Sequence, residues 1–314
     1  MKLSPFDTTT DSSALICLGS WVFGGQFWQG NKEIDSFNVL SEAPDLGINV
    51  IDTAPIYGNG QAERIIGKYL KKNRSKYFVA TKCGLIKNQR QVSHNLSANS
   101  IHKEINDSLQ RLCTDHVDLY QCHWPDPQTP IEETLNALLQ LKREGKIRHI
   151  GLSNYDKQEL TKALEITGDI VSLQSPYSFL NRSIEKKIMP LVQNRQLNLM
   201  IYGALAGGIL TGKYRESPQF NGPDARNFFY KYYDTDSHRI ITDFLKKIET
   251  IQKPLNQIAI NWVRQNPTVK TVILGCRNLD QLKSNAAALQ WELSCEEISL
   301  INKNLPFLDN LQPN

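Results

Sequence analysis

The 314-residue sequence contains no long apolar run, no C-x-x-C pair and no strong excess of one charge. No stretch is long enough to span a membrane, so we expect no membrane partner. In a chain of this length, six unpaired cysteines favour reduced thiols in the cytoplasm, and we expect no metal site. The 36 basic and 32 acidic residues leave a net charge of +4, which argues against a nucleic-acid-binding protein.

The rest of the composition is that of a soluble globular enzyme, with 40% hydrophobic and 22% charged residues. The N-terminal stretch Met1-Lys2-Leu3-Ser4-Pro5-Phe6-Asp7 lacks an apolar core segment, so we expect no signal peptide. Length alone suggests about two domains. Strand-like and helix-like segments alternate throughout, however, and this favours one domain over residues 1–314.

The alternation has eight repeats. The expected strands are 14–18, 48–51, 77–81, 117–122, 146–151, 170–173, 197–202 and 269–274. The expected helices are 33–46, 60–72, 97–112, 130–143, one ending near 166, 183–194 and 279–289. Eight βα repeats with short turns predict a closed parallel (β/α)8 TIM barrel. Residues 213–237 break the rhythm, and a loop of this length is usually functional.

Three of the expected strands end in polar residues that suit one reaction. Asp52 follows the second strand and Tyr57 lies five residues later, while Lys82 and His123 close the third and fourth strands. A (β/α)8 barrel builds its active site from the C-terminal ends of its strands. A phenol donates a proton, a lysine makes the phenol more acidic, a carboxylate keeps the lysine charged, and an imidazole polarises a carbonyl. Each residue alone could be a capping or packed loop residue, but together they indicate a catalytic site.

With this tetrad in this order, the chain resembles the aldo-keto reductases, a family of NAD(P)H-dependent barrel enzymes. The resemblance runs from Leu18-Gly19-Ser20-Trp21 to Asn285 and is strongest to bacterial general-stress and inositol-cluster reductases. It implies that Tyr57 is the general acid in reduction and the general base in oxidation. It also implies NADP(H) as the cofactor.

The resemblance also assigns the cofactor site, because no G-x-G-x-x-G motif follows a strand. Ser153, Asn154 and Gln174 match the residues that bind the carboxamide, and Tyr202 matches the aromatic that stacks on the nicotinamide. An amide side chain complements a carboxamide as both donor and acceptor. The full set implied by the family is Gly19, Trp21, Ser153, Asn154, Gln174, Tyr202, Leu205, Gly207, Gly212, Lys213, Gly275, Arg277, Gln281 and Asn285.

Arg277 would face a 2′-phosphate, since the guanidinium fork suits phosphate. Gln281 and Asn285, four residues apart, lie on one helix face and can reach the adenine together. The alternative is a solvated loop arginine and a polar helix face. The chain also departs from the family in two places: Tyr202-Gly203-Ala204-Leu205 replaces Tyr-Ser-Pro-Leu, and Ile273-Leu274-Gly275 replaces Ile-Pro-Gly. The first change removes a hydroxyl that can contact phosphate.

The segment Gly207-Gly208-Ile209-Leu210-Thr211-Gly212-Lys213 fits the G-x4-G-K part of a phosphate loop. The next residue is Tyr214, so the Ser or Thr that would hold magnesium is missing, and we exclude a nucleoside triphosphatase. Glycines still let backbone N–H groups approach a pyrophosphate, which the family binds at this loop.

Four aromatic residues, Trp21, Trp28, Trp124 and Tyr177, fall in loops at the expected barrel mouth. Aromatic walls suit a mostly apolar carbonyl substrate. The stretch Phe228-Phe229-Tyr230-Lys231-Tyr232-Tyr233 could close over cofactor or substrate. Aromatics interleaved with a lysine also suit single-stranded nucleic acid, but one loop in a nearly neutral protein disfavours that function. Trp262 and Trp291 lie in helix-like contexts and are expected in the core.

We therefore predict NADPH-dependent reduction of an aldehyde or ketone, with a small-molecule carbonyl substrate and an open oligomeric state. Two alternatives remain. The same tetrad can run the NAD(P)+-linked oxidation of a sugar or cyclitol alcohol. A slowly turning-over NADPH-sensing regulatory subunit, like the barrel β-subunits of potassium channels, would carry the same residues.

Overall fold

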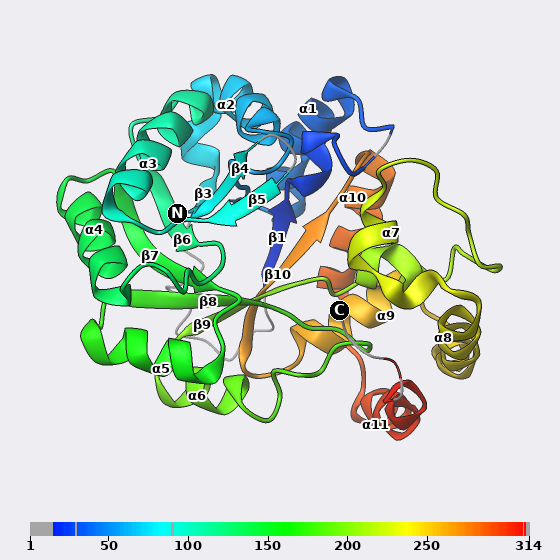
Figure 1. Cartoon of the computed structure of the whole chain (residues 1–314). Coiled ribbons are helices and arrows are strands. Elements are labelled where there is room, and N and C mark those ends of the chain that lie inside the picture. The colour runs from blue at the N-terminus through cyan, green and yellow to red at the C-terminus, as the bar shows by residue number, and fades with distance from the viewer. Residues whose placement is uncertain (1–14, 29, 89–90, 310, 312–314) are drawn as a thin grey trace.

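The computed structural model describes residues 15–28, 30–88, 91–309 and 311. Eight parallel strands close into a barrel in the order β1-β10-β9-β8-β7-β6-β3-β2, with helices around it (Figure 1). The barrel strands are β1 (Leu15–Gly19), β2 (Val50–Asp52), β3 (Phe78–Cys83), β6 (Val117–Cys122), β7 (Ile147–Ser153), β8 (Ile170–Pro176), β9 (Asn198–Tyr202) and β10 (Val269–Gly275). The predicted (β/α)8 barrel is confirmed. Residue 14 of the expected first strand and the N-terminal stretch considered for a signal peptide lie outside the described residues.

The main helices are α1 (Glu33–Glu42), α2 (Gln61–Asn73), α3 (Ala98–Leu112), α4 (Ile131–Arg143), α5 (Lys157–Ile166), α6 (Ile188–Asn194), α9 (Leu255–Arg264) and α10 (Leu279–Ala286). The helix expected over 33–46 ends earlier, at Glu42, and continues as a 3-10 turn that contains Pro44, which has no N–H to donate. The helix expected over 183–194 begins only at Ile188. Among the described residues, no helix has the length and hydrophobicity to cross a bilayer.

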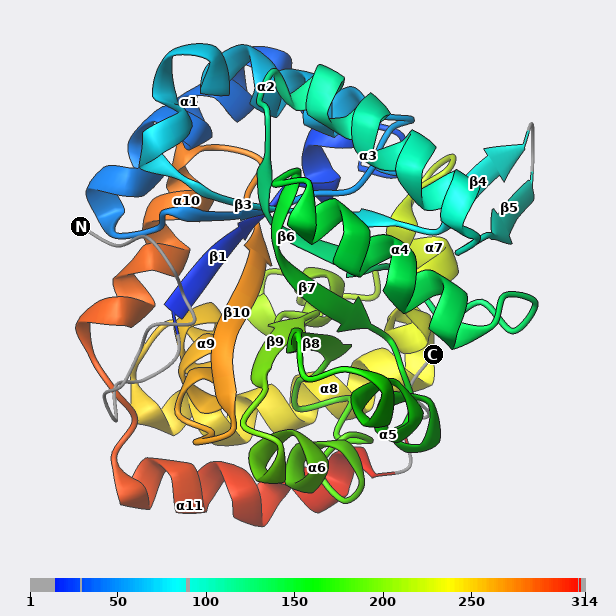
Figure 2. The same cartoon turned by 90° about the vertical axis from the view of Figure 1, so that its left-hand side faces the viewer.

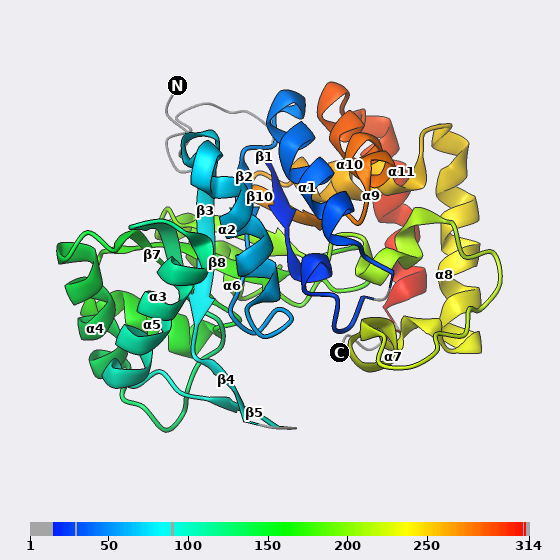
Figure 3. The same ribbon diagram turned by 90° about the horizontal axis from the view of Figure 1, so that it is seen from above.

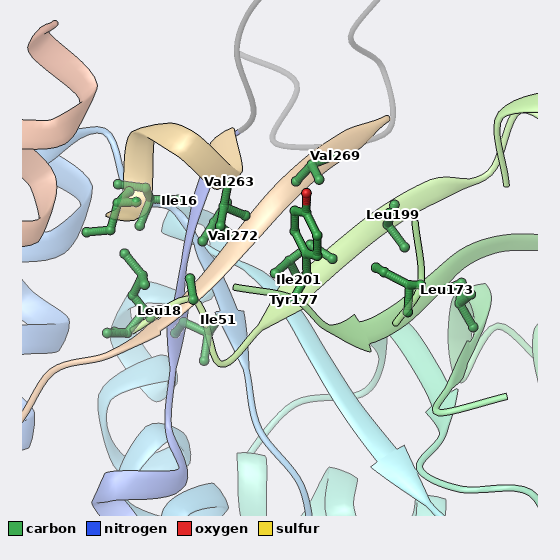
Figure 4. Packing of buried hydrophobic residues seen from close by; sticks show 14 of the residues in the cluster. Ile16, Leu18, Ile51, Leu173, Tyr177, Leu199, Ile201, Val263, Val269 and Val272 are labelled. Atoms are coloured by element: carbon green, nitrogen blue, oxygen red, sulfur yellow. The ribbon is translucent and has the colours of Figure 1, made fainter. Parts of the chain in front are cut away.

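The two faces of each strand have separate roles. Inward-facing residues form a small apolar cluster in the barrel interior: Cys17, Val50, Phe78, Ala80, Leu119, Met200 and Ile273. Outward-facing residues pack under the helices, and ten residues of this outer core are labelled in Figure 4. Side chains alternate along a strand with a period of two. The residues two positions after Val50, Ala80 and Leu119 therefore face inward as well, and they are Asp52, Lys82 and Gln121.

Two insertions extend the loops on the side of the barrel to which β3 points. The antiparallel hairpin of β4 (Leu85–Asn88) and β5 (Gln91–His94) follows β3, and the sequence did not predict it. The long segment 213–237 carries the short helix α7 (Ala225–Phe229), after which α8 (Thr235–Ile248) begins. Figures 2 and 3 show the hairpin and α7 on the same side of the barrel. A further helix, α11 (Cys295–Asn304), runs along the outside of the barrel.

Candidate active site

The side chains of Asp52, Tyr57 and Lys82 meet at the C-terminal end of the barrel. The Lys82 Nζ atom lies 2.5 Å from Asp52 Oδ2, 3.3 Å from the Tyr57 hydroxyl and 3.0 Å from the carbonyl oxygen of Thr53. Lys82 is fully buried and Asp52 is 2% exposed. Strands β2 and β3 are neighbours, with Asp52 in register with Ala80, and this pairing brings Asp52 beside Lys82.

Tyr57 is fixed by a close approach of two loops. It lies in the turn between β2 and α2, where the Gly60 N–H donates to the Pro55 carbonyl at 2.6 Å. Gly58 adopts φ +61°, and a Cβ atom there would lie 2.2 Å from the Gly24 carbonyl oxygen. Glycine at both 24 and 58 therefore allows the β1 loop, which begins with the 3-10 turn η1 (Trp21–Gly24), to pack against the Tyr57 turn.

His123 completes the tetrad from the end of β6. Its ring centroid lies 5.8 Å from that of Tyr57 at an interplanar angle of 85°, and its backbone N–H donates to the Cys83 carbonyl at 2.9 Å. Burial, together with the positive charge of Lys82 and the proximity of His94, lowers the pKa of His123 well below 6.5. His123 is therefore neutral at neutral pH, with one ring nitrogen as donor and one as acceptor.

Burial and charge act in opposite directions on Tyr57 and Lys82. Burial raises the pKa of Tyr57, Lys82 lowers it and Asp52 raises it, and the net pKa lies above the usual 10. Burial alone would lower the pKa of Lys82, but Asp52 and Tyr57 outweigh it, so this pKa is raised and Lys82 stays protonated. Lys82 does make the phenol more acidic than burial alone would leave it. The pKa of Tyr57 nevertheless does not fall below that of free tyrosine, because burial is the larger effect.

Two glutamine side chains contact the carboxylate of Asp52. The Nε2 atoms of Gln121 and Gln174 lie 3.2 and 2.9 Å from Asp52 Oδ1, and Gln174 Nε2 lies 3.3 Å from Gln121 Oε1. Gln121 was not among the site residues predicted from the sequence. Its signal was available, because Gln121 precedes His123 by two positions and therefore faces the same side of the strand.

The residues expected to bind a carboxamide come together at the ends of β7, β8 and β9. Asn154, with φ +64°, donates through Nδ2 to the His123 carbonyl at 2.9 Å and to Ser153 Oγ at 3.1 Å. The Tyr202 hydroxyl donates to Asn154 Oδ1 at 2.8 Å. The hydrogen bonds of the Gln174 side chain to Asp52 and Gln121 are both made by Nε2, so its amide oxygen takes part in neither. The set combines amide and hydroxyl groups that suit a carboxamide.

The glycine-rich loop after β9 has a backbone that favours glycine. Gly207, Gly208 and Gly212 have φ values of +69°, +98° and +72°. The Tyr230 ring covers Gly207, where a Cβ atom would lie 2.9 Å from it, and the Tyr233 hydroxyl donates to the Gly207 carbonyl at 2.9 Å.

At either end of this loop, Leu205 precedes the 3-10 turn η4 (Ala206–Thr211), and the Lys213 Nζ atom lies 4.6 Å from the centroid of the Tyr214 ring. The contacts of Tyr230 and Tyr233 with Gly207 show that the segment 213–237 folds back over the loop that was expected to bind pyrophosphate.

The residues expected at the adenosine end follow the paired strand ends Gly19 and Gly275. The backbone N–H of Arg277 donates to Gln281 Oε1 at 3.0 Å, so the Gln281 side chain shapes the arginine loop. Asn285 is 5% exposed, and its amide contacts Cys276 Sγ at 3.5 Å and Asn256 Nδ2 at 3.1 Å.

The long segment carries an ion pair between Asp224 and Arg226, whose shortest contact is 2.5 Å. Burial alone would raise the pKa of Asp224, yet Arg226 lowers it, with a smaller electrostatic contribution from Arg277. Arg277 therefore interacts electrostatically with this segment.

Aromatic side chains surround the mouth near Tyr57. The Trp21 ring lies 6.1 Å from Tyr57 and makes edge contacts with Trp28 at 5.6 Å and Phe229 at 5.4 Å. The Ala225 N–H donates to the Phe27 carbonyl at 2.8 Å, which ties α7 to the β1 loop.

Trp124, which directly follows His123, is 41% exposed and packs against His94 at 6.5 Å. Trp21, Trp28 and Trp124 thus lie around the mouth, and Phe229 joins them from the long segment.

The predicted position of Tyr177 in the pocket wall is wrong. Its ring is 2% exposed, stacks on Trp262 at 5.1 Å and donates through its hydroxyl to Glu185 at 2.8 Å. Figure 4 shows it in the outer core with Ile201 and Val269. The reason is strand parity: Gln174 faces inward, so Tyr177, three positions later and directly after the end of β8, faces outward. Trp262 is buried in the same core, as expected.

Comparison with known proteins agrees with this geometry. The sequence profile of the Aldo/keto reductase family matches residues 15–305. The chain belongs to the aldo/keto reductase family. Its similarity to aldo-keto reductase YhdN of Bacillus subtilis is 34% identity, covering 96% of this chain and 93% of that protein. Its similarity to the NADH-specific methylglyoxal reductase of Escherichia coli is 32% identity, covering 96% and 98%.

A solved structure gives the same result. The glycerol dehydrogenase of Gluconobacter oxydans superimposes with a TM-score of 0.86 at 31% identity, covering all of this chain and 96% of that one. The expected family is confirmed, and this aldo/keto reductase is an oxidoreductase whose family uses nicotinamide cofactors. Groups of three or more His, Cys, Asp or Glu side chains that could hold a metal ion do not occur in the part of the chain that the structure describes.

Proposed function

We propose that this aldo/keto reductase reduces aldehydes or ketones to alcohols, with NADPH as cofactor and Tyr57 as proton donor. The observation that carries the proposal is the position of Lys82 Nζ, 2.5 Å from Asp52 and 3.3 Å from the Tyr57 hydroxyl, beside a neutral His123. A cation held next to a buried phenol stabilises the phenolate that remains after proton donation.

Each residue then has a defined task. The neutral imidazole of His123 donates an N–H to the substrate carbonyl and orients it. The raised pKa of Tyr57 keeps its proton in place at neutral pH, and Tyr57 delivers it to the developing alkoxide. Lys82 stabilises the phenolate so formed, and Asp52 keeps Lys82 charged. When bound, the nicotinamide cofactor supplies the hydride in reduction and accepts it in oxidation.

The cofactor would be held along three groups of residues. Ser153, Asn154, Gln174 and Tyr202 would hold the nicotinamide end. The loop from Leu205 to Lys213 would hold the pyrophosphate, Gly275, Arg277, Gln281 and Asn285 would hold the adenosine end, and Gly19 and Trp21 would complete the set. The guanidinium of Arg277 supports NADPH, since a 2′-phosphate is the group that distinguishes it from NADH. One relative is named as NADH-specific, so the preference needs a direct measurement.

The substrate we propose is a small carbonyl compound bound among Trp21, Trp28, Trp124 and Phe229. Aromatic rings present apolar faces and bind compounds with little charge. One of the relatives is named for methylglyoxal, which is a small carbonyl compound.

The likeness to a glycerol dehydrogenase favours a second candidate, the NAD(P)+-linked oxidation of a polyol such as a sugar or cyclitol. In that direction Tyr57 acts as the base, which requires the phenolate and favours alkaline pH.

The experiment is a substrate panel. Methylglyoxal, an aromatic aldehyde, glycerol and a cyclitol are each assayed with both cofactors by the absorbance of the reduced nicotinamide. Faster turnover of carbonyls with NADPH supports the proposal, and faster turnover of polyols with the oxidised cofactor supports the second candidate. Binding of NADPH without turnover of any compound would contradict both and favour a regulatory role.

A further inference from the structure

Gln121 takes part in a closed set of hydrogen bonds beneath the tetrad. Its Nε2 donates to Asp52 Oδ1 at 3.2 Å, and its Oε1 accepts from Gln174 Nε2 at 3.3 Å. Gln174 Nε2 also donates to Asp52 Oδ1, at 2.9 Å. Asp52 thus has Lys82 on Oδ2 and two amides on Oδ1.

The barrel interior makes room for this glutamine. Gln121 is fully buried. Opposite it on β7, a Cβ atom at Gly151 would lie 3.0 Å from Gln121 Cγ and 2.5 Å from Ser172 Oγ. A buried amide is unfavourable unless it is hydrogen-bonded, and the bonds to Asp52 and Gln174 meet that requirement. An apolar residue at position 121, like Leu119 two positions earlier on the same strand, would fill the space without needing any polar partner.

We propose that Gln121 is a positioning residue, which with Gln174 holds the carboxylate of Asp52 in the place and charge state that keep Lys82 protonated beside Tyr57. This inference rests on the proposed function, because its consequence is expressed through the proton of Tyr57.

The physical argument concerns a buried ion pair. Taking both charges out of water is expensive, and the pair persists only if further hydrogen bonds stabilise the ions. Without the amide donors, a proton can move from Lys82 to Asp52: one N–H bond breaks, one O–H bond forms, and two neutral groups remain. The two amides favour the carboxylate over the acid, because N–H groups donate to it. They therefore oppose this neutralisation and preserve the cation that faces Tyr57.

Gln121 separates this role from cofactor binding. Gln174 belongs to the proposed carboxamide-binding set as well, so its substitution changes two functions at once. Among the described residues, the side chain of Gln121 bonds to Asp52 and Gln174 and belongs to none of the proposed cofactor contacts, so its loss should change cofactor affinity little.

Gln121→Met keeps the length of the side chain and removes the donor. We expect kcat for carbonyl reduction to fall roughly 10- to 100-fold, the range for one hydrogen bond to a charged group. The pKa of Tyr57 should rise by about one pH unit or more, as the nearby cation is lost. Ultraviolet difference titration of tyrosinate against Tyr57→Phe reads this pKa without turnover. Cofactor affinity, measured by fluorescence quenching, should stay within about twofold.

Gln121→Glu discriminates between positioning and packing. A carboxyl group placed beside Asp52 shares one proton with it. The protonated carboxyl group then donates a hydrogen bond to the ionised one, and the pair keeps a single negative charge toward Lys82. Positioning predicts that Glu retains more activity than Met at position 121. Packing predicts the reverse, because an apolar side chain suits a buried site better.

Leu119→Val is the matched control. Leu119 is buried on the same strand and faces the same interior, but its side chain takes no part in the hydrogen bonds among Asp52, Gln121 and Gln174. The substitution should lower the melting temperature while leaving the titration of Tyr57 in place. The proposal is overturned if Gln121→Met titrates like the wild type, or if Leu119→Val shifts the Tyr57 pKa equally. A wild type that reduces no carbonyl would instead contradict the proposed function, while the tyrosinate titration would still decide the role of Gln121.

Discussion

The Nζ atom of Lys82 lies 3.3 Å from the hydroxyl oxygen of Tyr57, and both side chains lie on the inner side of the barrel end. Lys82 is the group that lowers the pKa of Tyr57 against the effect of burial. Lys82→Met should therefore raise that pKa further. Asp52→Asn should have a smaller effect: it weakens the charge of the buried Lys82, but it also removes the carboxylate that raises the pKa of Tyr57.

The sign of the pH dependence follows from the role of Tyr57. Reduction needs the phenol, so its rate should be constant at neutral pH and fall as the pH rises through the raised pKa. Oxidation needs the phenolate and should increase over the same range. In Lys82→Met both limbs should move to higher pH, measured as kcat against pH in each direction. Unmoved profiles in both variants would mean that the Asp52–Lys82 pair is structural only.

Arg277→Ala should weaken NADPH and leave NADH almost unchanged. Loss of a charged hydrogen-bond partner typically costs ~1.5–3 kcal/mol, or about one to two powers of ten in Kd. Fluorescence titration with both cofactors measures this. Lys283→Ala is the control, because Lys283 is a cation on the same helix as Gln281 that pairs with Glu42. Equal losses for the two cofactors would show that Arg277 shapes its loop instead of binding a 2′-phosphate.

Phe229→Ala should raise KM for an aromatic aldehyde by about 2- to 10-fold, the range for one aromatic contact, with cofactor affinity unchanged. Phe229 contacts both Trp21 and Phe27, whereas Phe228 contacts Phe27 alone among the ring pairs at the mouth. Phe228→Ala should thus have the smaller effect. An equal KM for the wild type and Phe229→Ala would place the substrate elsewhere in the mouth.

Glu104 predicts a pH dependence of stability that is separate from catalysis. Burial raises its pKa from 4.5 to about 7, although the Gly84 N–H and Ser100 stabilise its charge. A raised folded-state pKa contributes stability that is complete below the unfolded value of 4.5 and is lost as the pH rises through about 7. At ~1.4 kcal/mol per pH unit the loss approaches roughly 3 kcal/mol.

Glu104→Gln should therefore lose less stability between pH 4.5 and pH 7 than the wild type. Urea unfolding at several pH values measures the difference. Parallel curves for the two proteins would show that Glu104 is ionised in the folded state throughout.

Strand-end residues could be predicted from the sequence because β-branched and apolar runs marked the strands. Asp52, Lys82 and His123 each follow such a run, and parallel strands bring their ends together. The spacing of Gln121 from His123 indicates that it faces the barrel interior, but its contact with Asp52 depends on how the strands are paired. Tyr177 was misplaced for a related reason: the sequence showed where β8 ends, but the parity at its end decides which face the tyrosine takes.

The insertions were predicted less well. All four residues of β5 are exposed, so no alternation of polar and apolar residues marks that strand. For α8 the signal was present. Asp234 caps the helix through the Ser237 N–H, and Ile241, Phe244 and Ile248 recur at helical spacing on its buried face. The segment 213–237 could be recognised as an irregular loop, but its packing on Gly207 depends on contacts distant in sequence.

The central claim, that Tyr57 is the proton donor, is tested most directly by Tyr57→Phe, which keeps the ring and removes the hydroxyl. The single measurement is kcat for carbonyl reduction under saturating cofactor, with the cofactor Kd determined on the same preparation. We expect kcat to fall by about 10²–10⁴, with Kd unchanged within about twofold. Wild-type turnover in Tyr57→Phe would contradict the assignment of Tyr57 and, with it, the role given to Lys82.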